Sequence, residues 1–492
     1  MPEALTEPSD TAEPISDEVS AEELSHPESL RSVRVGPVPA EEGGLWSASR
    51  RPLTIGLVLT ITLVAAEALA VATAMPVVAR DLGGLELYGL VFSAFFIGSL
   101  FGIVVVAGLI DRVGVVPPFL VGLGLFAIGL ALAGSAPSMA VLIGARFIQG
   151  VGGGTIPPVA YVAIGRSLPE HLRPRMFAML STAWILPGVF GPAIAGFVAE
   201  TFHWRLVFLG LLPLIVVSGT MAYRGLQALP AGHAAAAGAE SLWVRVGNAA
   251  VLAIGVVLLT AGLASENPVL LAVVSVAGIV VTGLALRRLT PPGTLRARRG
   301  YPAAVLLRGI LTFAFFCVDA YVALLLVEVR GWSATAAGVA LTAATLSWTA
   351  GSWTQARLSH RIRAERFVQL GFPVVAVFIG ALGAVLLPQV PAWLAIPIFA
   401  AAGFGMGLTY SQFAIIVLRD APPAIVGRVT AGLTLSDVIG TALGTGVSAA
   451  AVAAAVRAGL GPGPGIAVAV AVGTVVALLG FVLSPRLRTT VR

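Results

Sequence analysis

The sequence predicts an all-α integral membrane protein, and three observations support this fold class. Of the 492 residues, 57% are hydrophobic and only 11% are charged, whereas a soluble domain carries roughly 25% charged residues. Apolar runs long enough to cross a bilayer recur along the chain, and arginines gather in the loops between them. These features exclude an ordinary soluble enzyme, and they explain the net charge of +6 without nucleic acid as a partner.

The first 49 residues differ from the rest of the chain. They contain 11 acidic residues and two arginines, and they are rich in serine and proline. Such a composition offers too little apolar surface to offset the entropy lost on ordering. We therefore expect residues 1–49 to form a disordered acidic tail. We expect this tail to be a passive solvated segment; the alternative is that it binds partners.

Fourteen apolar segments follow this tail, and each is expected to be a helix because hydrocarbon cannot satisfy free backbone N–H and C=O groups. We expect a six-helix bundle over 50–224, a two-helix insert with its loops over 225–300, a second six-helix bundle over 301–485, and a short tail over 486–492. The apolar segments run over residues 52–78, 88–110, 115–135, 138–165, 175–199, 205–223, 246–264, 268–286, 302–327, 334–355, 367–387, 392–418, 426–455 and 465–484.

The arginines predict the orientation of these spans. If the N-terminus is cytoplasmic, 24 of the 30 arginines fall in cytoplasmic loops and tails, and four fall in outer loops. This asymmetry is the positive-inside pattern of multi-pass membrane proteins. It predicts that both termini are cytoplasmic, and it supports an even number of spans because one missed span would reverse the alternation beyond it.

Weak internal similarity predicts that the two bundles are repeats. Glu67 in the first span corresponds to Asp319 in the ninth at an offset of 252 residues, and Arg175 corresponds to Arg428 at an offset of 253. The loop that follows Leu109 corresponds to the loop that follows Leu358 at an offset of 249. Repeated halves with a site at the membrane midplane are a common plan of transporters.

Four local motifs occur in order along the first bundle. The first span contains EALAVATAMP at 67–76, and AGLIDRVG at 107–114 ends the second span. The fourth span contains RFIQGVG at 146–152, and the fifth contains GVFGPAIAG at 188–196.

In this order the motifs resemble those of the major facilitator superfamily, and within it the fourteen-span drug:proton antiporters. The resemblance covers residues 50–485 and implies the major-facilitator fold, with two six-helix bundles and two inserted helices. Some positions depart from the family pattern: Ala107, Pro187 and Ala195 replace glycines, and Val115 and Val116 stand where basic residues are expected.

Glu67 and Arg146 are expected at similar depth in the membrane, so an ion pair between them is feasible. A charged group at the bilayer centre costs about 2.5–3.5 kcal/mol on insertion scales and usually faces an interior cavity. Burial favours the neutral form of Glu67 whereas a guanidinium favours its charged form, and the sequence does not decide between them. The resemblance implies that Glu67 takes part in proton coupling; the alternative is a permanent structural pair.

Asp319 and Asp437 have no obvious basic partner at similar depth, which makes both candidates for carrying a proton. The alternative is that each accepts a hydrogen bond from a neighbouring helix. Arg308 lies eleven residues from Asp319 along the same helix. We expect Arg308 to anchor its helix end by reaching the membrane interface.

Two further groups carry expected conformational roles. Asp111, Arg112 and Gly114 are expected to form a cytoplasmic latch, because a carboxylate can meet a neighbouring helix N-terminus or an arginine. A solvated loop charge is the alternative. The resemblance implies that Gly188, Gly191, Pro192 and Gly196 form the antiporter motif, and small residues also permit close helix packing and a bend.

Aromatic side chains are expected to line a substrate cavity that suits small amphipathic, often cationic, molecules. For each one, packing or lipid contact is the alternative. The chosen residues are Phe95, Trp184, Phe190, Phe316, Tyr321 and Tyr410.

The sequence predicts a secondary active transporter of the bacterial cytoplasmic membrane that exports small amphipathic compounds in exchange for protons. Export of a specific endogenous lipid, peptide or siderophore is one alternative, proton-coupled uptake is another, and a transport-like receptor or scaffold is a third. No metal or cofactor motif is present in a credible context, and an ATP-binding loop is not expected. The expected partners are substrate, protons and membrane lipid, and the expected state is a monomer.

Overall fold

The computed structural model describes residues 44–169, 172–227, 242–263, 265, 267–422 and 425–488. The contacts divide the chain into Met1–Gly44 and Leu45–Arg492, and the described helices belong to the second unit. Most of the predicted disordered tail, residues 1–43, lies outside the described residues. So does the segment 228–241 of the predicted insert.

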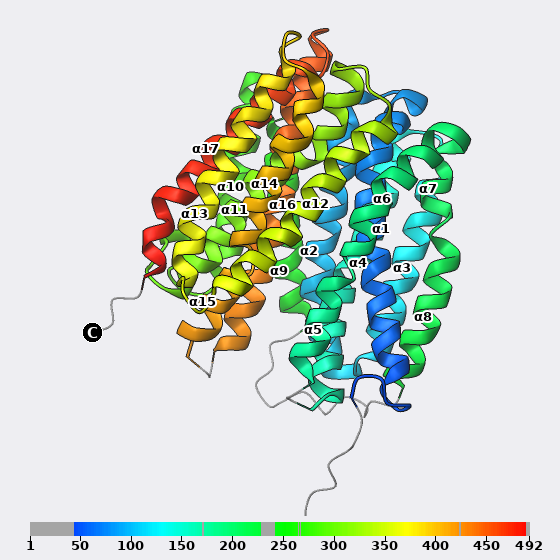
Figure 1. Ribbon diagram of the computed structural model, residues 1–492, viewed down its shortest axis with the longest axis vertical. Helices are drawn as coiled ribbons and strands as arrows, with labels where there is room; N and C mark the ends of the chain where they lie inside the picture. The colour runs from blue at the N-terminus through cyan, green and yellow to red at the C-terminus, as the bar shows by residue number, and fades with distance from the viewer. Residues whose placement is uncertain are drawn as a thin grey trace, which may run out of the picture. The chain divides into compact units, whose positions relative to one another are not determined.

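The described part of the chain is helical, which confirms the predicted fold class (Figure 1). Each of the fourteen predicted spans corresponds to a helix or a pair of short helices. The first six are α1 (Arg51–Leu82), α2 (Tyr88–Val113), α3 (Val116–Gly134), α4 (Met139–Ser167), α5 with α6 (Arg173–Thr182, Ile185–Val198) and α7 with α8 (Arg205–Leu209, Leu212–Leu226). The inserted pair is α9 (Leu242–Leu263) and α10 (Pro268–Leu289). The last six are α11 (Tyr301–Leu324), α12 (Ala334–Leu358), α13 (Ala364–Leu382), α14 with α15 (Ala395–Thr409, Gln412–Asp420), α16 (Val426–Arg457) and α17 (Gly463–Leu483).

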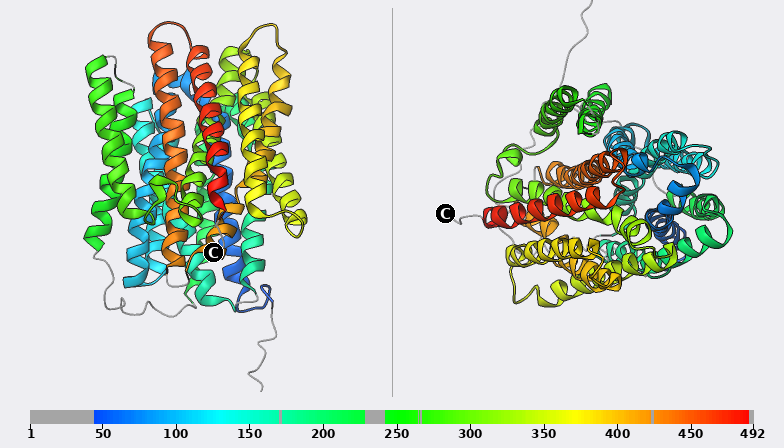
Figure 2. Two further views of the ribbon diagram at one scale, coloured as in Figure 1. Left: turned by 90° about the vertical axis from the view of Figure 1, so that its left-hand side faces the viewer. Right: turned by 90° about the horizontal axis from the view of Figure 1, so that it is seen from above.

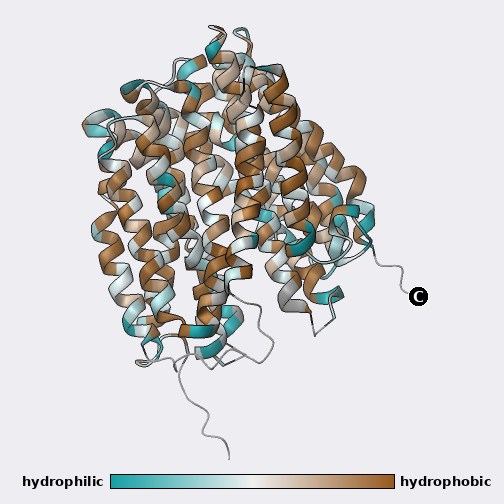
Figure 3. Ribbon diagram, turned by 180° about the vertical axis from the view of Figure 1, so that it is seen from behind, coloured by the Kyte–Doolittle hydropathy of each residue, from teal (hydrophilic) through white to brown (hydrophobic). Residues whose placement is uncertain are grey.

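Thirteen of the described helical segments are long and apolar enough to cross a membrane. The predicted span 334–355 is not among them, although the 25-residue helix α12 occupies it. Threonine, serine and glycine recur along α12 and lower its hydropathy. Figure 3 shows hydrophobic residues along the helices and hydrophilic residues gathered at the helix ends, as expected for helices that face lipid.

Proline and small polar residues begin several helices. Pro52 and Pro302 lie in the first turns of α1 and α11, where a missing backbone N–H costs no intrahelical hydrogen bond. The Asn267 side chain accepts hydrogen bonds from the backbone N–H groups of Val269 at 2.9 Å and Leu270 at 3.3 Å, and so caps α10. These local signals fix where the apolar runs become helical.

Three predicted spans are interrupted within the described helices. The breaks lie at 183–184 between α5 and α6, at 210–211 between α7 and α8, and at 410–411 between α14 and α15. A break leaves backbone carbonyl groups without their intrahelical partners, so another group has to satisfy them inside the membrane.

The helices pack as two groups that meet along two seams. In the first group α1 packs on α6 and α8, and α4 packs on α2 and α3. In the second group α11 packs on α16 and α17, and α14 packs on α12 and α13. The groups meet where α2 packs on α16 and where α6 packs on α12. We call these contacts the α2–α16 seam and the α6–α12 seam.

The inserted helices cover only one of these seams. Helix α9 packs on both α2 and α16, and α10 packs on α9. Figure 2 shows the α9–α10 pair beside α2 and α16, on the opposite side from α12 (right-hand view). A separate cluster of buried apolar residues fills this contact: Ile97 and Leu100 of α2, Leu252 and Val256 of α9, Ala285 of α10, and Leu435, Ile439 and Ala442 of α16.

Direct polar contacts join the two groups at the end of the bundle where α1 ends, which we call the Leu82 end. The opposite end, where α1 begins, is the Arg51 end. There α5 packs on α1, α4 and α6, whereas α15 packs on α11, α13, α14 and α16. Each of these short helices therefore packs within its own group.

Candidate functional site

Glu67 on α1 and Arg146 on α4 form a buried ion pair, with Arg146 Nη1 donating to Glu67 Oε1. Both side chains are almost inaccessible to solvent. The same Nη1 donates to Gln149 Oε1 at 2.6 Å, and the guanidinium lies 4.4 Å from the centre of the Phe95 ring. The structure thus brings together the two residues that the depth argument paired, and it adds Gln149, one helical turn from Arg146.

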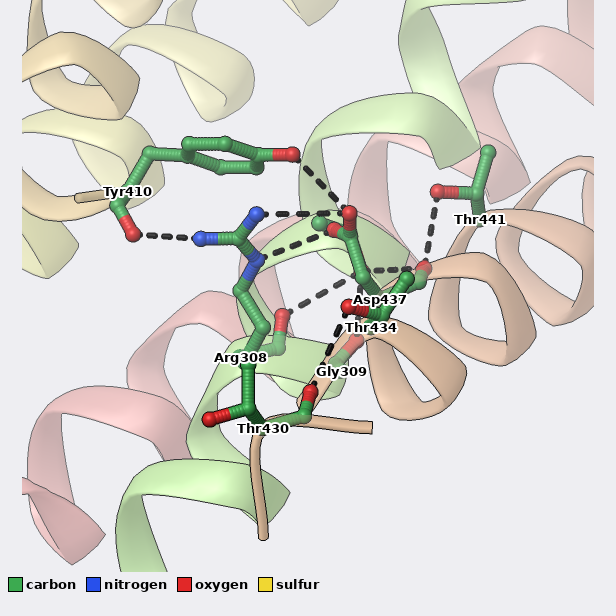
Figure 4. Close-up of polar contacts among 8 residues, drawn as sticks. Arg308, Gly309, Tyr410, Thr430, Thr434, Asp437 and Thr441 are labelled. Carbon is green, nitrogen blue, oxygen red and sulfur yellow. Dashed lines mark hydrogen bonds and ion pairs between the residues drawn. The ribbon is translucent and has the colours of Figure 1, made fainter. Parts of the chain in front are cut away.

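A second ion pair lies in the other group of helices (Figure 4). Arg308 Nε on α11 lies 3.0 Å from Asp437 Oδ1 on α16, and Arg308 Nη2 lies 3.3 Å from Asp437 Oδ2. The Tyr410 hydroxyl donates to Asp437 Oδ2 at 2.9 Å. Arg308 Nη1 donates to the Tyr410 carbonyl, which the break between α14 and α15 leaves free.

This arrangement corrects two expectations. Arg308 does not reach the membrane interface, because its side chain is buried and faces Asp437. Asp437 has a basic partner, contrary to the prediction that it lacks one. The two residues are 129 positions apart in sequence, so depth estimates along a single helix could not pair them.

Asp319 on α11 differs from the other two interior acids. Within the part of the chain that the structure describes, it forms no hydrogen bond or ion pair. Its side chain is partly exposed. The backbone beside it is fixed instead, because the Tyr88 hydroxyl of α2 donates to the carbonyl of Ala320 at 3.1 Å. Asp319 is therefore a half-buried carboxyl group without a partner among the described residues, held on an ordered helix.

Close glycine contacts show which helices of the two groups are equivalent, and this equivalence explains why Asp319 has no arginine partner. A side chain at Gly150, Gly154 or Gly102 would collide with the backbone of Phe95, Ser99 or Val151, where α2 meets α4. A side chain at Gly403, Gly407 or Gly351 would collide with the backbone of Ala344, Trp348 or Phe404, where α12 meets α14. The offsets are 249 residues for α2 to α12 and 253 for α4 to α14, which confirms the repeat.

The same offset of 253 takes Arg146 to Phe399. Phe399 is buried and stacks on Phe315, with ring centres 5.4 Å apart. An apolar ring therefore occupies the place in the second group where the first group holds its arginine.

The residues of the predicted cytoplasmic latch lie at the Arg51 end of α2. The side chain of Asp111 is outside the described part of the structure, and Arg112 is exposed. Gly114 ends α2 with φ +80°, a conformation that favours glycine. The latch remains a prediction.

A charge cluster that the sequence analysis missed lies at the same end of the second group. The Glu365 carboxylate of α13 is buried and accepts from Arg419 Nη2 of α15 at 2.7 Å, and it lies 3.5 Å from Arg363 Nε. Glu365 directly follows the loop after Leu358, which corresponds to the loop of the predicted latch. An acid at this place in the second repeat is the sequence feature that could have indicated the cluster.

The glycines of the predicted antiporter motif lie on α6 and set its distance from α12. A Cβ atom at Gly196 would lie 2.7 Å from Thr335 Cα, and one at Gly188 would collide with the side chain of Thr345. Pro192 lies against Gly338 of α12. Gly191 faces α1 instead, where a Cβ atom would lie 3.9 Å from Leu69.

The six aromatic residues that were expected to line a cavity occupy different surroundings. Phe316 and Tyr410 belong to an aromatic cluster with Phe315 and Trp348. Phe95 lies beneath the Arg146 guanidinium. Tyr321 is buried between helices and donates to the Thr445 carbonyl at 3.4 Å. Trp184 and Phe190 are 43% and 54% exposed.

Three contacts at the Leu82 end, which the sequence analysis did not identify, join the two groups. Arg80 Nε lies 2.5 Å from Glu328 Oε1. Glu200 Oε2 accepts from Thr335 Oγ1 at 2.6 Å, and Glu200 Oε1 accepts from the first backbone N–H of α12. The third contact is the Tyr88 hydrogen bond to Ala320. Single charges near helix ends carry no pairing signal in the sequence, so only the fold reveals these contacts.

Among the described residues, no group of three or more His, Cys, Asp or Glu side chains lies close enough together to hold a metal ion. Among the described residues, the charged groups in the middle of the spans are the pairs Glu67 with Arg146 and Asp437 with Arg308, together with Asp319. Such groups can exchange protons and contact a cation in a low-dielectric setting.

Comparison with known proteins places this arrangement in context. The family model described as Major Facilitator Superfamily matches residues 55–445. A Mycobacterium tuberculosis protein named as a multidrug-efflux transporter is 28% identical over 431 residues, which cover 83% of this chain and 89% of that protein. Multidrug resistance protein 3 of Bacillus subtilis is 26% identical, with 81% and 78% covered.

Solved structures show the same fold at lower identity. The nucleoside transporter NupG is 12% identical with a TM-score of 0.62, covering 89% of this chain and 99% of that chain. A POT family transporter bound to a conjugated peptide is 16% identical with a TM-score of 0.65, covering 88% and 96%.

Proposed function

Because the chain belongs to the major facilitator superfamily and is a multi-pass membrane transporter, we propose that it exports small amphipathic compounds in exchange for protons. Relatives named as multidrug efflux transporters support export. The carrying observation is the set of interior acids, in which Glu67 is paired with Arg146 while Asp319 is half-buried and has no partner among the described residues.

The proposed coupling uses the difference between these two acids. Protonation of Glu67 removes its charge and weakens its attraction for Arg146, which frees α1 and α4 to separate. Asp319 meets a cationic group of the substrate or a proton, but not both together, because either one neutralises the carboxylate. Such competition at one carboxyl group is a simple physical basis for exchange.

We also propose that the Arg51 end faces the cytoplasm. The arginine asymmetry supports this orientation. In this orientation the polar contacts at the Leu82 end join the two groups on the outer side of the membrane. Alternating access requires these contacts to break when the outer side opens.

The test is dye efflux in everted vesicles or proteoliposomes under an imposed pH gradient. Wild type is compared with Glu67→Gln and Asp319→Asn, and Glu86→Gln in the loop before α2 is the matched control. We expect gradient-driven transport in wild type and in the control, and at least a tenfold loss in one or both interior variants.

Each outcome has a separate meaning. Wild-type rates in both interior variants would overturn the assignment of coupling to Glu67 and Asp319 and would direct attention to Asp437. The absence of dye transport by wild type would favour export of a specific endogenous product, or uptake, over multidrug efflux.

A further inference from the structure

The Glu365 cluster borders a hollow that the proposed transport mechanism does not use. We call it the α13 hollow, because it lies at the first turn of α13, beside the chain that follows α17. Its volume is about 150 Å³, whereas one water molecule needs roughly 10–15 Å³. The hollow can therefore hold a polar group larger than water. Four side chains line it: Arg363, Glu365, Arg366 and Arg488.

The acids at the α13 hollow already have cationic partners. Arg419 Nη2 lies 2.7 Å from Glu365 Oε1, and Arg363 Nε lies 3.5 Å from Glu365 Oε2. Arg419 Nε also lies 2.6 Å from Asp420 Oδ1. The Glu365 carboxylate lines the hollow, but its charge is offset by these two arginines.

Two arginines of the hollow have no carboxylate partner among the described residues. The side chain of Arg366 is exposed and forms no hydrogen bond or ion pair with the described part of the chain. Arg488 Nη2 donates to the neutral Gln369 Oε1 at 3.5 Å. Two guanidinium groups are therefore available to an anion. Guanidinium groups bind phosphate well, because two parallel N–H groups match two of its oxygens.

The hollow lies where an apolar span begins. The span that contains α13 starts at Ala364, between the arginines of the hollow. Leu370 follows Arg366 by one turn on the same face of α13 and is 55% exposed. Val482 in the last turn of α17 is 70% exposed. The arginines thus lie at the depth of lipid headgroups, with apolar surface directly beyond them.

The apolar surfaces of α13 and α17 adjoin each other (Figure 1). A side chain at Gly480 of α17 would collide with the Phe372 ring of α13, so the two helices pack closely. The short helix η8 (Ser484–Leu487) continues from α17 and packs on α13 as well. Farther from the hollow, Val377 and Val475 are also exposed. A molecule with a phosphate group and attached apolar chains matches the hollow and this surface together.

We propose that the α13 hollow binds the phosphate group of an anionic phospholipid, whose acyl chains lie along α13 and α17. Arg366 and Arg488 hold the phosphate, and Arg363 stays with Glu365. Basic pockets at the ends of membrane helices are suited to phospholipid headgroups. A bound lipid of this kind would connect the start of α13 to the chain that follows α17.

The first test measures lipid binding to the purified protein by native mass spectrometry. Phosphatidylglycerol, phosphatidylcholine and inorganic phosphate are titrated separately. We expect wild type to bind phosphatidylglycerol more tightly than phosphatidylcholine. The double variant Arg366→Gln with Arg488→Gln should bind phosphatidylglycerol about tenfold more weakly or worse, because two charge-assisted hydrogen bonds are lost. Both arginines are exposed, so their replacement leaves the helix packing intact.

The matched control is the double variant Arg51→Gln with Arg224→Gln. These exposed arginines lie at the same end of the bundle, on the neighbouring helices α1 and α8, so the control removes the same charge. It should bind phosphatidylglycerol as wild type does. Equal weakening in both double variants, or none in the Arg366–Arg488 variant, would overturn the proposal. Displacement of phosphatidylglycerol by an equal concentration of inorganic phosphate would assign the hollow to a soluble anion and overturn the lipid assignment.

The second test locates the bound lipid. Phosphatidylglycerol with a diazirine near its glycerol group is mixed into phosphatidylcholine vesicles that contain the protein, and adducts formed under light are mapped by mass spectrometry. We expect adducts concentrated on residues 366–377 and 475–488, and a loss of this enrichment in the Arg366–Arg488 variant. Adducts spread evenly over the exposed faces of α3, α10, α13 and α17 would contradict a specific site.

Discussion

The interior acids differ in what surrounds them, and this difference governs what their loss would do. Glu67 and Asp437 each face an arginine, so removing either acid leaves a cation in an apolar setting. Asp319 is partly exposed and has no partner among the described residues, so its removal strands no charge. Stability and transport should therefore respond differently to each substitution.

Replacing Asp437 with leucine should destabilise the protein strongly, by about 3 kcal/mol, because Arg308 would remain buried without its counter-ion. The double variant Asp437→Leu with Arg308→Met removes both charges and should recover much of the loss. Thermal unfolding in detergent measures both variants. A double variant as unstable as the single one would show that the ion pair itself stabilises the bundle.

Glu67→Gln should lower the thermal stability measurably, since the Arg146 guanidinium loses its counter-ion and keeps the neutral Gln149 and the Phe95 ring as partners. Asp319→Asn should lower the stability less than Glu67→Gln does, because no described cation loses its partner. Unfolding curves of the two variants in the same detergent provide the comparison. Equal losses would mean that Asp319 has a structural partner after all.

At the scale of helices, the spacing between α6 and α12 is set by individual glycines rather than by the whole motif. Gly196 and Gly188 face α12 closely, whereas Gly191 faces α1 with ordinary van der Waals room. The four residues of the predicted motif therefore make two kinds of contact. Only the glycines at the seam should be sensitive to added volume.

Gly196→Ala should destabilise the protein by about 1–3 kcal/mol, because the new methyl group would meet the backbone of Thr335. Gly191→Ala is the matched control within the same helix and should be nearly neutral. Thermal unfolding ranks the two variants. A destabilised Gly191→Ala and an unaffected Gly196→Ala would contradict the packing described for this seam.

Helix positions were predictable from the sequence, but contacts between distant helices were not. Apolar length and arginine placement located all fourteen predicted spans, including α12, because the bilayer dictates both features. Similar depth along α1 and α4 also paired Glu67 with Arg146. The pair of Arg308 with Asp437 escaped prediction because it depends on the rotation of α11 against α16 and on the break at Tyr410. Neither the rotation nor the break leaves a periodic signal.

At the scale of the whole molecule, the closure at the Leu82 end is held by contacts of modest strength. The Arg80 side chain is 55% exposed, so its ion pair with Glu328 contributes less than about 1 kcal/mol. Glu200 caps α12 across the seam, and a cap contributes about 1 kcal/mol. Contacts of this size suit an equilibrium that has to reverse during each transport cycle.

Charge reversal at this closure should shift the equilibrium between closed and open forms. Arg80→Glu places two acids together and should raise the population that is open at the Leu82 end by a few-fold, while the swap Arg80→Glu with Glu328→Arg should restore it. Distances between spin labels attached to the ends of α1 and α11 measure this population. An identical distribution in the single variant and wild type would show that the ion pair does not hold the closure.

The matched glycine contacts of α2 with α4 and of α12 with α14 also bear on how the two halves can differ. They show that the two halves keep the same close backbone packing although the ionisable residues differ between them. Arginine in one half and phenylalanine in the other mark that difference at Arg146 and Phe399. A bundle built from two similarly packed halves can change the ionisable residues of one half without altering the packing of the other. The same fold can in this way come to bind different substrates.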